Sequence, residues 1–295
     1  MGQSDVVPAL AGGSALKTGN RSIGGILIDA GRLKIEDVER VLRVQREQHL
    51  PFGDAAIKLG LLSQADIDFA LSHQFEYPYL LRGHSNVSEE LIAAYAPFSP
   101  LAEGLRALRC QLMLRWFGTD PAHKALAIVS AERKEGRSFV AANLAVVFAQ
   151  LGERTLLIDA DMRNPCQHRL FGLDNRAGLS AVLSGRGARE AINRVASLLD
   201  ISVLPAGAPP PNPSELLGRP LFRQLLQELA KEYDVILLDT PAAGETTDAL
   251  TISMYAGAAL VVVRKNAARI WRVRGVVDGA AQSSTTLVGS LLNDY

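Results

Sequence analysis

The stretch that decides the fold is Ser130-Ala-Glu-Arg-Lys-Glu-Gly-Arg-Ser138, which directly follows the apolar run Ala125-Leu-Ala-Ile-Val129. A strand, a tight loop and a helix that opens at Ser138 form a geometry that binds phosphate. This is because the free backbone N–H groups at a helix N-terminus point at the anion. The stretch therefore predicts a phosphate-binding loop at the end of a buried strand.

The loop departs from the P-loop pattern G-x-x-x-x-G-K-[ST] at two of its four defining positions. Gly136 and Ser138 match the pattern, whereas Ala131 and Arg137 stand where it has glycine and lysine. A loop rich in Glu, Lys and Gly before a helix is also a common surface turn. The loop alone leaves both interpretations open.

Two further apolar runs end in aspartate and bear on the choice between a phosphate-binding loop and a surface turn. They are Leu156-Leu-Ile-Asp-Ala-Asp161 and Val235-Ile-Leu-Leu-Asp239, in the spacing of βαβ units. The carboxyl ends of parallel strands share one edge of a sheet, where carboxylates can hold Mg²⁺ and manage a proton. An aspartate after a strand can also simply cap a turn. Three such strand ends in this order favour a nucleotide-binding site.

The composition is typical of an α/β enzyme. The chain has 295 residues, which suggests two domains, and 48% of them are hydrophobic, enough for a sizeable core. The formal net charge is zero, so nucleic acid is not expected as a partner. Cys110 and Cys166 lie far apart without metal-ligand spacing, which favours a reducing compartment. We expect no transmembrane segment, because no run approaches ~18 apolar residues.

Residues 21–76 contain an internal repeat, which follows a stretch (residues 1–20) that we expect to be a disordered tail. Each copy reads G-x6-G-x6-φ-x3-L-x2-Q, where φ is aliphatic, and the second copy begins 29 residues after the first. The apolar positions at i and i+4 place a stripe on a helix, and the glycines suit left-handed turns. The repeat predicts two similar helical units. Its positions are Gly24, Gly31, Val38, Leu42 and Gln45, then Gly53, Gly60, Ile67, Leu71 and Gln74.

This repeat resembles the MshEN-type domain found at the N-terminus of secretion and pilus ATPases, some of which bind cyclic di-GMP. Members that bind the dinucleotide tend to have arginine two residues before the first glycine of each copy. This chain has Ser22 and Pro51 there, with Arg21 one residue away. A guanine edge prefers a bidentate arginine. Both cyclic di-GMP binding and protein docking remain open for this domain.

Residues 77–99 are expected to connect the two domains and to lead into a helix near Leu101–Trp116. That helix carries the motif E-x2-R-x2-R at Glu103, Arg106 and Arg109. Residues three and six positions apart lie on one helix face, so the motif predicts a charged strip. Such a strip is by default solvated.

With that helix included, residues 100–295 resemble a bacterial tyrosine kinase of the polysaccharide co-polymerase family, the group related to the MinD and ParA ATPases. The whole chain is similar to the EpsG-type chain-length-determinant kinases. The resemblance implies a doubly wound, mostly parallel α/β P-loop sheet, preceded here by the small helical tandem-repeat domain. It identifies the three strand ends as the Walker A, Walker A′ and Walker B motifs, and it covers Pro211-Asn-Pro-Ser-Glu-Leu-Leu217.

The resemblance also implies roles for individual residues, with ATP and Mg²⁺ as cofactors. Arg137 would contact the β- and γ-oxygens, unless Lys134 or a neighbouring subunit supplies that charge. Asp159 would orient or deprotonate a tyrosine hydroxyl, with Asp161 nearby for metal or proton work. Ser138 and Asp239 would hold Mg²⁺. Nucleotide contacts are expected from Lys134, Glu135, Gly136, Arg137, Ser138, Phe139 and Asn293, the last at adenine or simply as a strand-end residue.

At the level of the whole protein, the resemblance implies an ATP-dependent protein-tyrosine kinase that regulates exopolysaccharide chain length. Its expected partner is a membrane co-polymerase, which would hold this cytoplasmic protein at the inner membrane. Homo-oligomers would form through Glu103, Arg106 and Arg109. Two alternatives remain, because Arg137 replaces the usual lysine. One is a MinD/ParA-like ATPase switch, and the other is a catalytically silent adapter.

One basic run carries no intervening acid and includes Trp271. It could contact DNA or anionic lipid, but a solvated or subunit-facing helix surface is the expected interpretation. Its members are Arg264, Lys265, Arg269, Arg272 and Arg274.

Overall fold

The computed structural model describes residues 22–75, 79–80, 82–187, 189–198 and 200–294. The tail expected at residues 1–20 lies outside them. The chain forms two compact units. The first extends to Tyr79 and includes residues 96–98, and the second comprises Leu80–Tyr95 and the chain from Ser99 onwards. Each unit is described by itself.

The first unit consists of two helix pairs, as the repeat predicts. Gly31 and Gly60, which follow the first helix of each pair, have nearly equal positive φ values of 68° and 67°, so the expected left-handed turns are present. A small core of its own, with Leu27 and Val41 fully buried, holds the pairs together. The helices are α1 (Ile23–Asp29), α2 (Ile35–Gln48), α3 (Phe52–Lys58) and α4 (Gln64–Phe75).

The second unit is built on a seven-stranded sheet in the order β3-β4-β2-β5-β1-β6-β7. All neighbouring pairs are parallel except the edge pair β3–β4, so the expected doubly wound, mostly parallel sheet is confirmed. The strands are β1 (Ala125–Val129), β2 (Thr155–Asp159), β3 (Asn193–Arg194), β4 (Ile201–Leu204), β5 (Val235–Asp239), β6 (Ala258–Arg264) and β7 (Thr286–Asn293).

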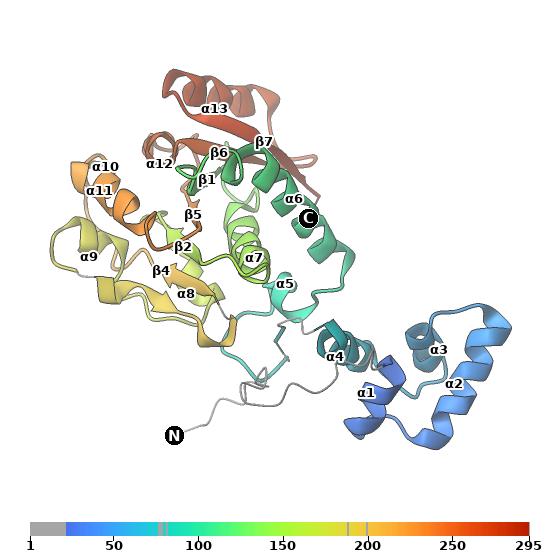
Figure 1. The fold of residues 1–295 in the computed structure, drawn as a ribbon. Coiled ribbons are helices and arrows are strands. Elements are labelled where there is room, and N and C mark those ends of the chain that lie inside the picture. The colour runs from blue at the N-terminus through green and yellow to red at the C-terminus, as the bar shows by residue number, and fades with distance from the viewer. Residues whose placement is uncertain (1–21, 76–78, 81, 188, 199, 295) are drawn as a thin grey trace. The chain divides into compact units, whose positions relative to one another are not determined.

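Helices cover both faces of this sheet, as Figure 1 shows. One face packs against α5 (Ile92–Tyr95), α6 (Pro100–Leu112) and α7 (Arg137–Ala149), and a π-helical turn, Met113–Phe117, follows α6. The other face packs against α9 (Leu179–Leu183), α10 (Pro213–Leu217), α11 (Pro220–Leu229), α12 (Asp248–Ala256) and α13 (Ile270–Gln282). Short elements complete the unit: α8 (Gln167–Leu170) and 3₁₀ turns at Arg189–Ala191 and Ala196–Leu198.

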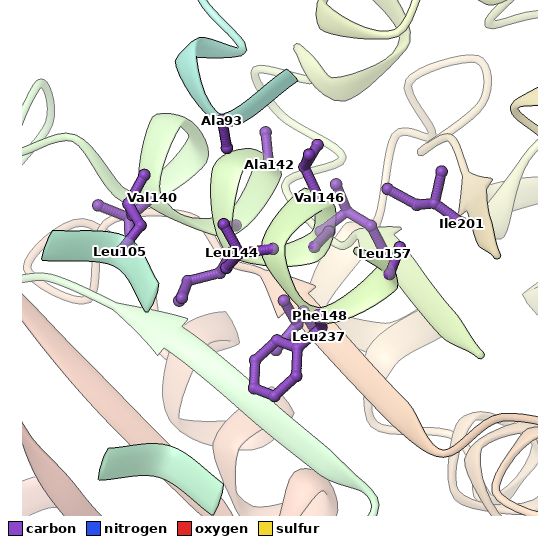
Figure 2. Close-up of a cluster of buried hydrophobic side chains, with 14 of the residues drawn as sticks. Ala93, Leu105, Val140, Ala142, Leu144, Val146, Phe148, Leu157, Ile201 and Leu237 are labelled. Carbon is purple, nitrogen blue, oxygen red and sulfur yellow. The ribbon is translucent and has the colours of Figure 1, made fainter. Parts of the chain in front are cut away.

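The two cores follow from the period-two alternation of buried strands. On β1, Leu126 and Ile128 join the core under α7, whereas Ala125 and Ala127 join the opposite core. Helix α7 is apolar nearly all round, which suits an element packed between the sheet and two other helices. Figure 2 shows its side chains between Ala93 of α5, Leu105 of α6 and Leu157 of β2. This packing fixes the position of the helix that follows the P-loop.

Part of the expected connector belongs to the second unit. The amide of Ala93 donates to Asn143 Oδ1 of α7 at 3.0 Å, and Gln150 Nε2 donates to the Ala93 carbonyl at 2.9 Å. Helix α5 therefore packs on α7, within the second unit. Over the described parts of the chain, no helix is both long and apolar enough to cross a membrane.

Candidate active site

The P-loop lies between β1 and α7, at the carboxyl edge of the sheet. No side chain caps α7, so its first-turn N–H groups, which include those of Ser138 and Phe139, face the loop as an anion-binding turn. Gly136 has φ 98°, and a Cβ there would lie 2.2 Å from Asn293 Nδ2. Only glycine fits this position, as the P-loop pattern requires.

Charged loop residues shape the loop itself. Glu135 is buried, and its Oε2 accepts from the Glu132 amide at 2.8 Å. Lys134 adopts a left-handed conformation with φ 61°, and its side chain is exposed. Glu135 therefore braces the turn, while Lys134 is free to extend toward solvent or a ligand.

Arg137 is buried, and the protein itself binds its guanidinium. Nε donates to the Thr240 carbonyl at 2.9 Å, and Nη1 donates to the Glu132 carbonyl at 2.7 Å and to Ser130 Oγ. These acceptors lie on the P-loop and on the residue after β5. Arg137 thus connects the Walker A loop to the end of the Walker B strand.

Asp159 and Asp239 lie side by side, because β2 and β5 are paired in a register that aligns these two residues. Both are fully buried. Burial raises the pKa of Asp239 to about 6, although hydrogen bonds from Gln167 and Ser138 oppose the rise. Burial and then the neighbouring Asp239 raise the pKa of Asp159 well above its ordinary value. Two adjacent carboxylates in a dry site disfavour double ionisation unless a cation joins them.

The site has the donors and acceptors that a hydrated magnesium ion needs. Asp159 Oδ1 and Asp239 Oδ1 are buried and have no hydrogen-bond partner among the described residues. Magnesium keeps several waters and takes one or two carboxylates besides substrate phosphates. The residues present therefore fit the ion.

Asp161 serves mainly its own loop. Its Oδ1 accepts from the amides of Arg163 and Asn164 at 3.2 and 2.9 Å. It lies close enough to raise the pKa values of Asp159 and Asp239 through its charge, as a smaller cause than burial. These hydrogen bonds give Asp161 a turn-forming role beside the two central carboxylates.

Asn293, at the end of β7, contacts the P-loop directly. Its Nδ2 donates to the Glu135 carbonyl at 3.0 Å. Two residues of the basic run also reach this loop, since Arg272 Nε lies 3.0 Å from Glu132 Oε1 and Arg264 Nη1 donates to the Lys134 carbonyl at 3.4 Å. Arg264 and Arg272 of the basic run therefore contact the P-loop, whereas other members, such as Arg269 and Arg274, are exposed.

Sequence reasoning missed several residues at this edge. Gln167 is fully buried and binds both central carboxylates. Arg163 pairs with the buried Asp248 at 3.0 Å, and Ser214 Oγ donates to the same carboxylate at 2.6 Å. The network ties the Pro211–Leu217 segment to the Walker A′ loop. Apart from the bond between Gln167 and Asp159, these contacts join residues far apart along the chain, so they have no local sequence signal.

The E-x2-R-x2-R motif lies on α6, but its members do not form one uniform strip. Glu103 is exposed and pairs with Arg106 at 2.6 Å. Arg109 Nη1 instead donates to the Val147 carbonyl at 2.7 Å, which ties α6 to α7. Glu103 is thus the exposed member of the motif, whereas the side chain of Arg106 is only 18% exposed.

Fold and site together define a P-loop nucleotide-binding protein of the MinD/ParA-like class. The family model described as "Cellulose biosynthesis protein BcsQ" matches residues 124–283, more than half of the chain. The MinD septum-site protein of Pyrococcus horikoshii, solved with Mg-ADP, shares the fold at 24% identity, with a TM-score of 0.52 over 58% of this chain and 70% of that one.

Closer relatives give the family. Tyrosine-protein kinase YwqD of Bacillus subtilis is 33% identical over 209 residues, which are 71% of this chain and 87% of that protein. The kinase domain of Escherichia coli tyrosine kinase ETK superimposes with a TM-score of 0.66 at 32% identity, over 69% of this chain and 79% of that one. Some relatives are far longer, and the matching part of this chain spans 26% of tyrosine-protein kinase ptk of Acinetobacter johnsonii. The chain belongs to the bacterial tyrosine-protein kinase family, with a BcsQ-type P-loop domain.

Proposed function

We propose that this chain is an ATP-dependent protein-tyrosine kinase that acts in exopolysaccharide polymerisation and export and regulates chain length. The observation that carries the proposal is the meeting of the P-loop, Asp159 and Asp239 at one sheet edge, in a chain of the tyrosine-kinase family. Bound Mg²⁺-ATP would supply the phosphoryl group and neutralise its developing charge.

Each residue has a proposed part in this reaction. Gly136 and the N–H groups up to Phe139 bind phosphate, and Lys134 and Glu135 complete the loop. Ser138 and Asp239 hold Mg²⁺, with Asp161 supporting the metal and proton chemistry nearby. Asp159 accepts the tyrosine proton through Oδ1, which has no hydrogen-bond donor among the described residues. Arg137 faces the phosphates, and Asn293 faces the base.

A second candidate is a nucleotide-driven switch without tyrosine transfer. The observation that favours it is that the guanidinium of Arg137 donates three hydrogen bonds to acceptors of the protein itself. Incubation of the full chain with γ-labelled ATP separates the two candidates. Labelled phosphotyrosine supports the kinase, free phosphate alone supports the switch, and neither product supports a silent adapter.

The whole-protein context is also proposed from the family. A membrane co-polymerase protein would be the partner that holds the chain at the cytoplasmic face of the inner membrane. Homo-oligomers would form through α6, where Glu103 is 72% exposed and Arg109 bonds to α7. Pull-down with the cytoplasmic segment of a candidate co-polymerase tests the first point, and light scattering tests the second.

For the first unit we propose a docking role, in the manner of an MshEN-like module. Ser22 caps α1 through its hydroxyl, and Pro51 stands at the same place before α3. Neither side chain can offer a bidentate fork to guanine. Arg21 lies outside the described residues. Calorimetry with cyclic di-GMP tests the point, and a 1:1 or 2:1 binding isotherm would replace docking by dinucleotide sensing.

A further inference from the structure

Gln167 is the residue that touches all three nucleotide motifs. Its backbone N–H donates to Asp159 Oδ2 at 2.9 Å. Its side-chain Nε2 donates to Asp239 Oδ2 at 2.7 Å and to the Ser138 carbonyl at 3.1 Å. The residue is fully buried at the start of α8, so these bonds are shielded from water. Through its backbone N–H and its side-chain amide, this one residue therefore links Walker A, Walker A′ and Walker B.

The chemistry of the neighbours fixes which way this amide points. Asp239 Oδ2 and the Ser138 carbonyl are both acceptors, so the NH₂ group must face them. The Oε1 atom consequently points elsewhere, and it is buried with no donor in the described part of the chain. Asp159 Oδ1 and Asp239 Oδ1 are in the same condition. Three acceptor oxygens without donors gather at one dry edge.

A buried acceptor without a donor costs free energy, about 1–3 kcal/mol for a neutral group and more for a charged one. Such groups persist where a ligand supplies what is missing. A hydrated divalent cation offers positive charge to the carboxylates and water O–H donors to an amide oxygen. A neutral amide also adds no third negative charge beside Asp159 and Asp239, whose pKa values burial has already raised.

We propose that Gln167 is a positioning residue of the magnesium site. Its NH₂ group holds Asp239 Oδ2, so that Oδ1 faces the ion, and its Oε1 offers an acceptor to the water shell of the ion. This inference rests on the proposed nucleotide chemistry. It adds a metal-orienting role for a residue outside the three motifs, since outer partners of metal ligands commonly set affinity.

The test uses the full chain and the variant Gln167→Met, which keeps the volume of the side chain but removes its donors and its acceptor. Binding of a fluorescent ADP analogue is measured in EDTA and then across a Mg²⁺ titration. We expect metal-free affinity within twofold of the parent, and a Mg²⁺ concentration for half-maximal effect at least tenfold higher. Outer partners of metal ligands typically cost 10–100-fold in metal affinity.

Two further variants keep the result decisive. Gln167→Glu keeps the shape but presents a carboxylate to Asp239, and we expect it to need still more Mg²⁺ at pH 8. Gln150→Met is the matched control, because Gln150 also bonds to a backbone carbonyl but at the far end of α7. It should leave the Mg²⁺ titration unchanged. Thermal melting in EDTA checks that each variant is folded.

A Mg²⁺ titration of Gln167→Met or of Gln167→Glu that overlays the parent would overturn the proposal and leave Gln167 as a packing residue. This assay never reads phosphotyrosine. If the chain fails to phosphorylate tyrosine, the labelled-ATP experiment reports it, while the Mg²⁺ result for Gln167 is unaffected. The two failures are therefore distinguishable.

Discussion

At the scale of single residues, Arg137 shows how a substitution in a known motif can acquire a structural task. A lysine ammonium is a compact point charge, whereas a guanidinium is a planar fork with five donors. Here three of those donors reach Ser130, Glu132 and Thr240, and Nη2 has no bond to any other described residue. These hydrogen bonds hold the loop to the end of β5, and in the proposed function Nη2 is the group that would contact phosphate.

Replacing Arg137 should therefore affect both stability and binding. We expect Arg137→Ala to lower the free energy of unfolding by about 2–4 kcal/mol, because buried acceptors lose a charged donor. The same variant should weaken nucleotide binding by about 1.5–3 kcal/mol, the usual worth of a hydrogen bond to a charged group. Urea unfolding and a labelled-ATP titration measure the two effects. Parent-like affinity would transfer the phosphate role to Lys134 or to another subunit.

Arg137→Lys is the sharper variant, since it restores the P-loop pattern. One ammonium cannot reproduce the bond from Nε to Thr240 together with the two bonds from Nη1. We expect a loss of about 1–2 kcal/mol in unfolding free energy with nucleotide affinity retained. Differential scanning fluorimetry with and without ATP gives both values. A variant as stable as the parent would show that the three hydrogen bonds of Arg137 contribute nothing to the free energy of unfolding.

Asp239 illustrates a conflict between stability and function. An acid whose folded pKa is raised stabilises the fold fully below its unfolded pKa of about 3.9, and that contribution is lost as the pH rises through the folded pKa. With a folded pKa of about 6, Asp239 should lower the stability of the metal-free protein as the pH rises from about 4 to about 6. Mg²⁺ would offset this loss by favouring the carboxylate.

The variant Asp239→Asn should consequently be inactive and more stable. Turnover of Mg-ATP should vanish, because a ligand charge disappears while the volume hardly changes. Melting of the metal-free protein at pH 7 should rise, and the difference from the parent should shrink toward pH 4. Undiminished turnover would remove Asp239 from the metal site. A lower melting temperature at pH 7 would show that burial of its charge costs nothing.

At the scale of elements, the sequence predicts the strands and the P-loop because their signals are local. Apolar runs that end in aspartate identify β2 and β5, and the 29-residue repeat identifies the helix pairs of the first unit. Gln167, Asp248 and the inner arginines of the basic run carry no such signal. Their roles depend on contacts between residues 72 to 140 positions apart, which only the register of the sheet and the packing of α13 establish.

The motif residues on α6 can be tested separately for a role in assembly and for a role in packing the helix on α7. Glu103 is exposed and pairs with Arg106, whose side chain is only 18% exposed, whereas Arg109 donates to a carbonyl of α7. We expect Glu103→Ala with Arg106→Ala to shift any oligomer toward monomer, because a charged pair at an interface would lose its partners there. Arg109→Ala should instead lower the melting temperature. Multi-angle light scattering reads assembly, and an unchanged mass would leave the pair as solvated surface.

At the scale of the whole molecule, the chain has separate cores in its two units. Leu27 belongs to the core of the first unit, and Leu144 of α7 belongs to the core beneath the P-loop, both fully buried. The first unit has fewer than 60 described residues, and so small a unit is only marginally stable, because it buries a smaller fraction of its surface than a large domain does. Units with their own cores can unfold as separate cooperative steps.

Leu27→Ala and Leu144→Ala should therefore affect different unfolding transitions, one for each unit. Removing a buried leucine side chain costs about 2–5 kcal/mol, enough to unfold a marginal first unit while leaving the P-loop unit intact. We expect Leu27→Ala to keep ATP affinity within twofold and to change only the lower-temperature transition in calorimetry. Leu144→Ala should lower the midpoint temperature of the other transition, the one whose midpoint ATP with Mg²⁺ raises. Ligand binding stabilises only the unit that holds the site. If Leu27→Ala weakened ATP binding tenfold, the two units would be energetically coupled, and the first would act on the kinase site itself.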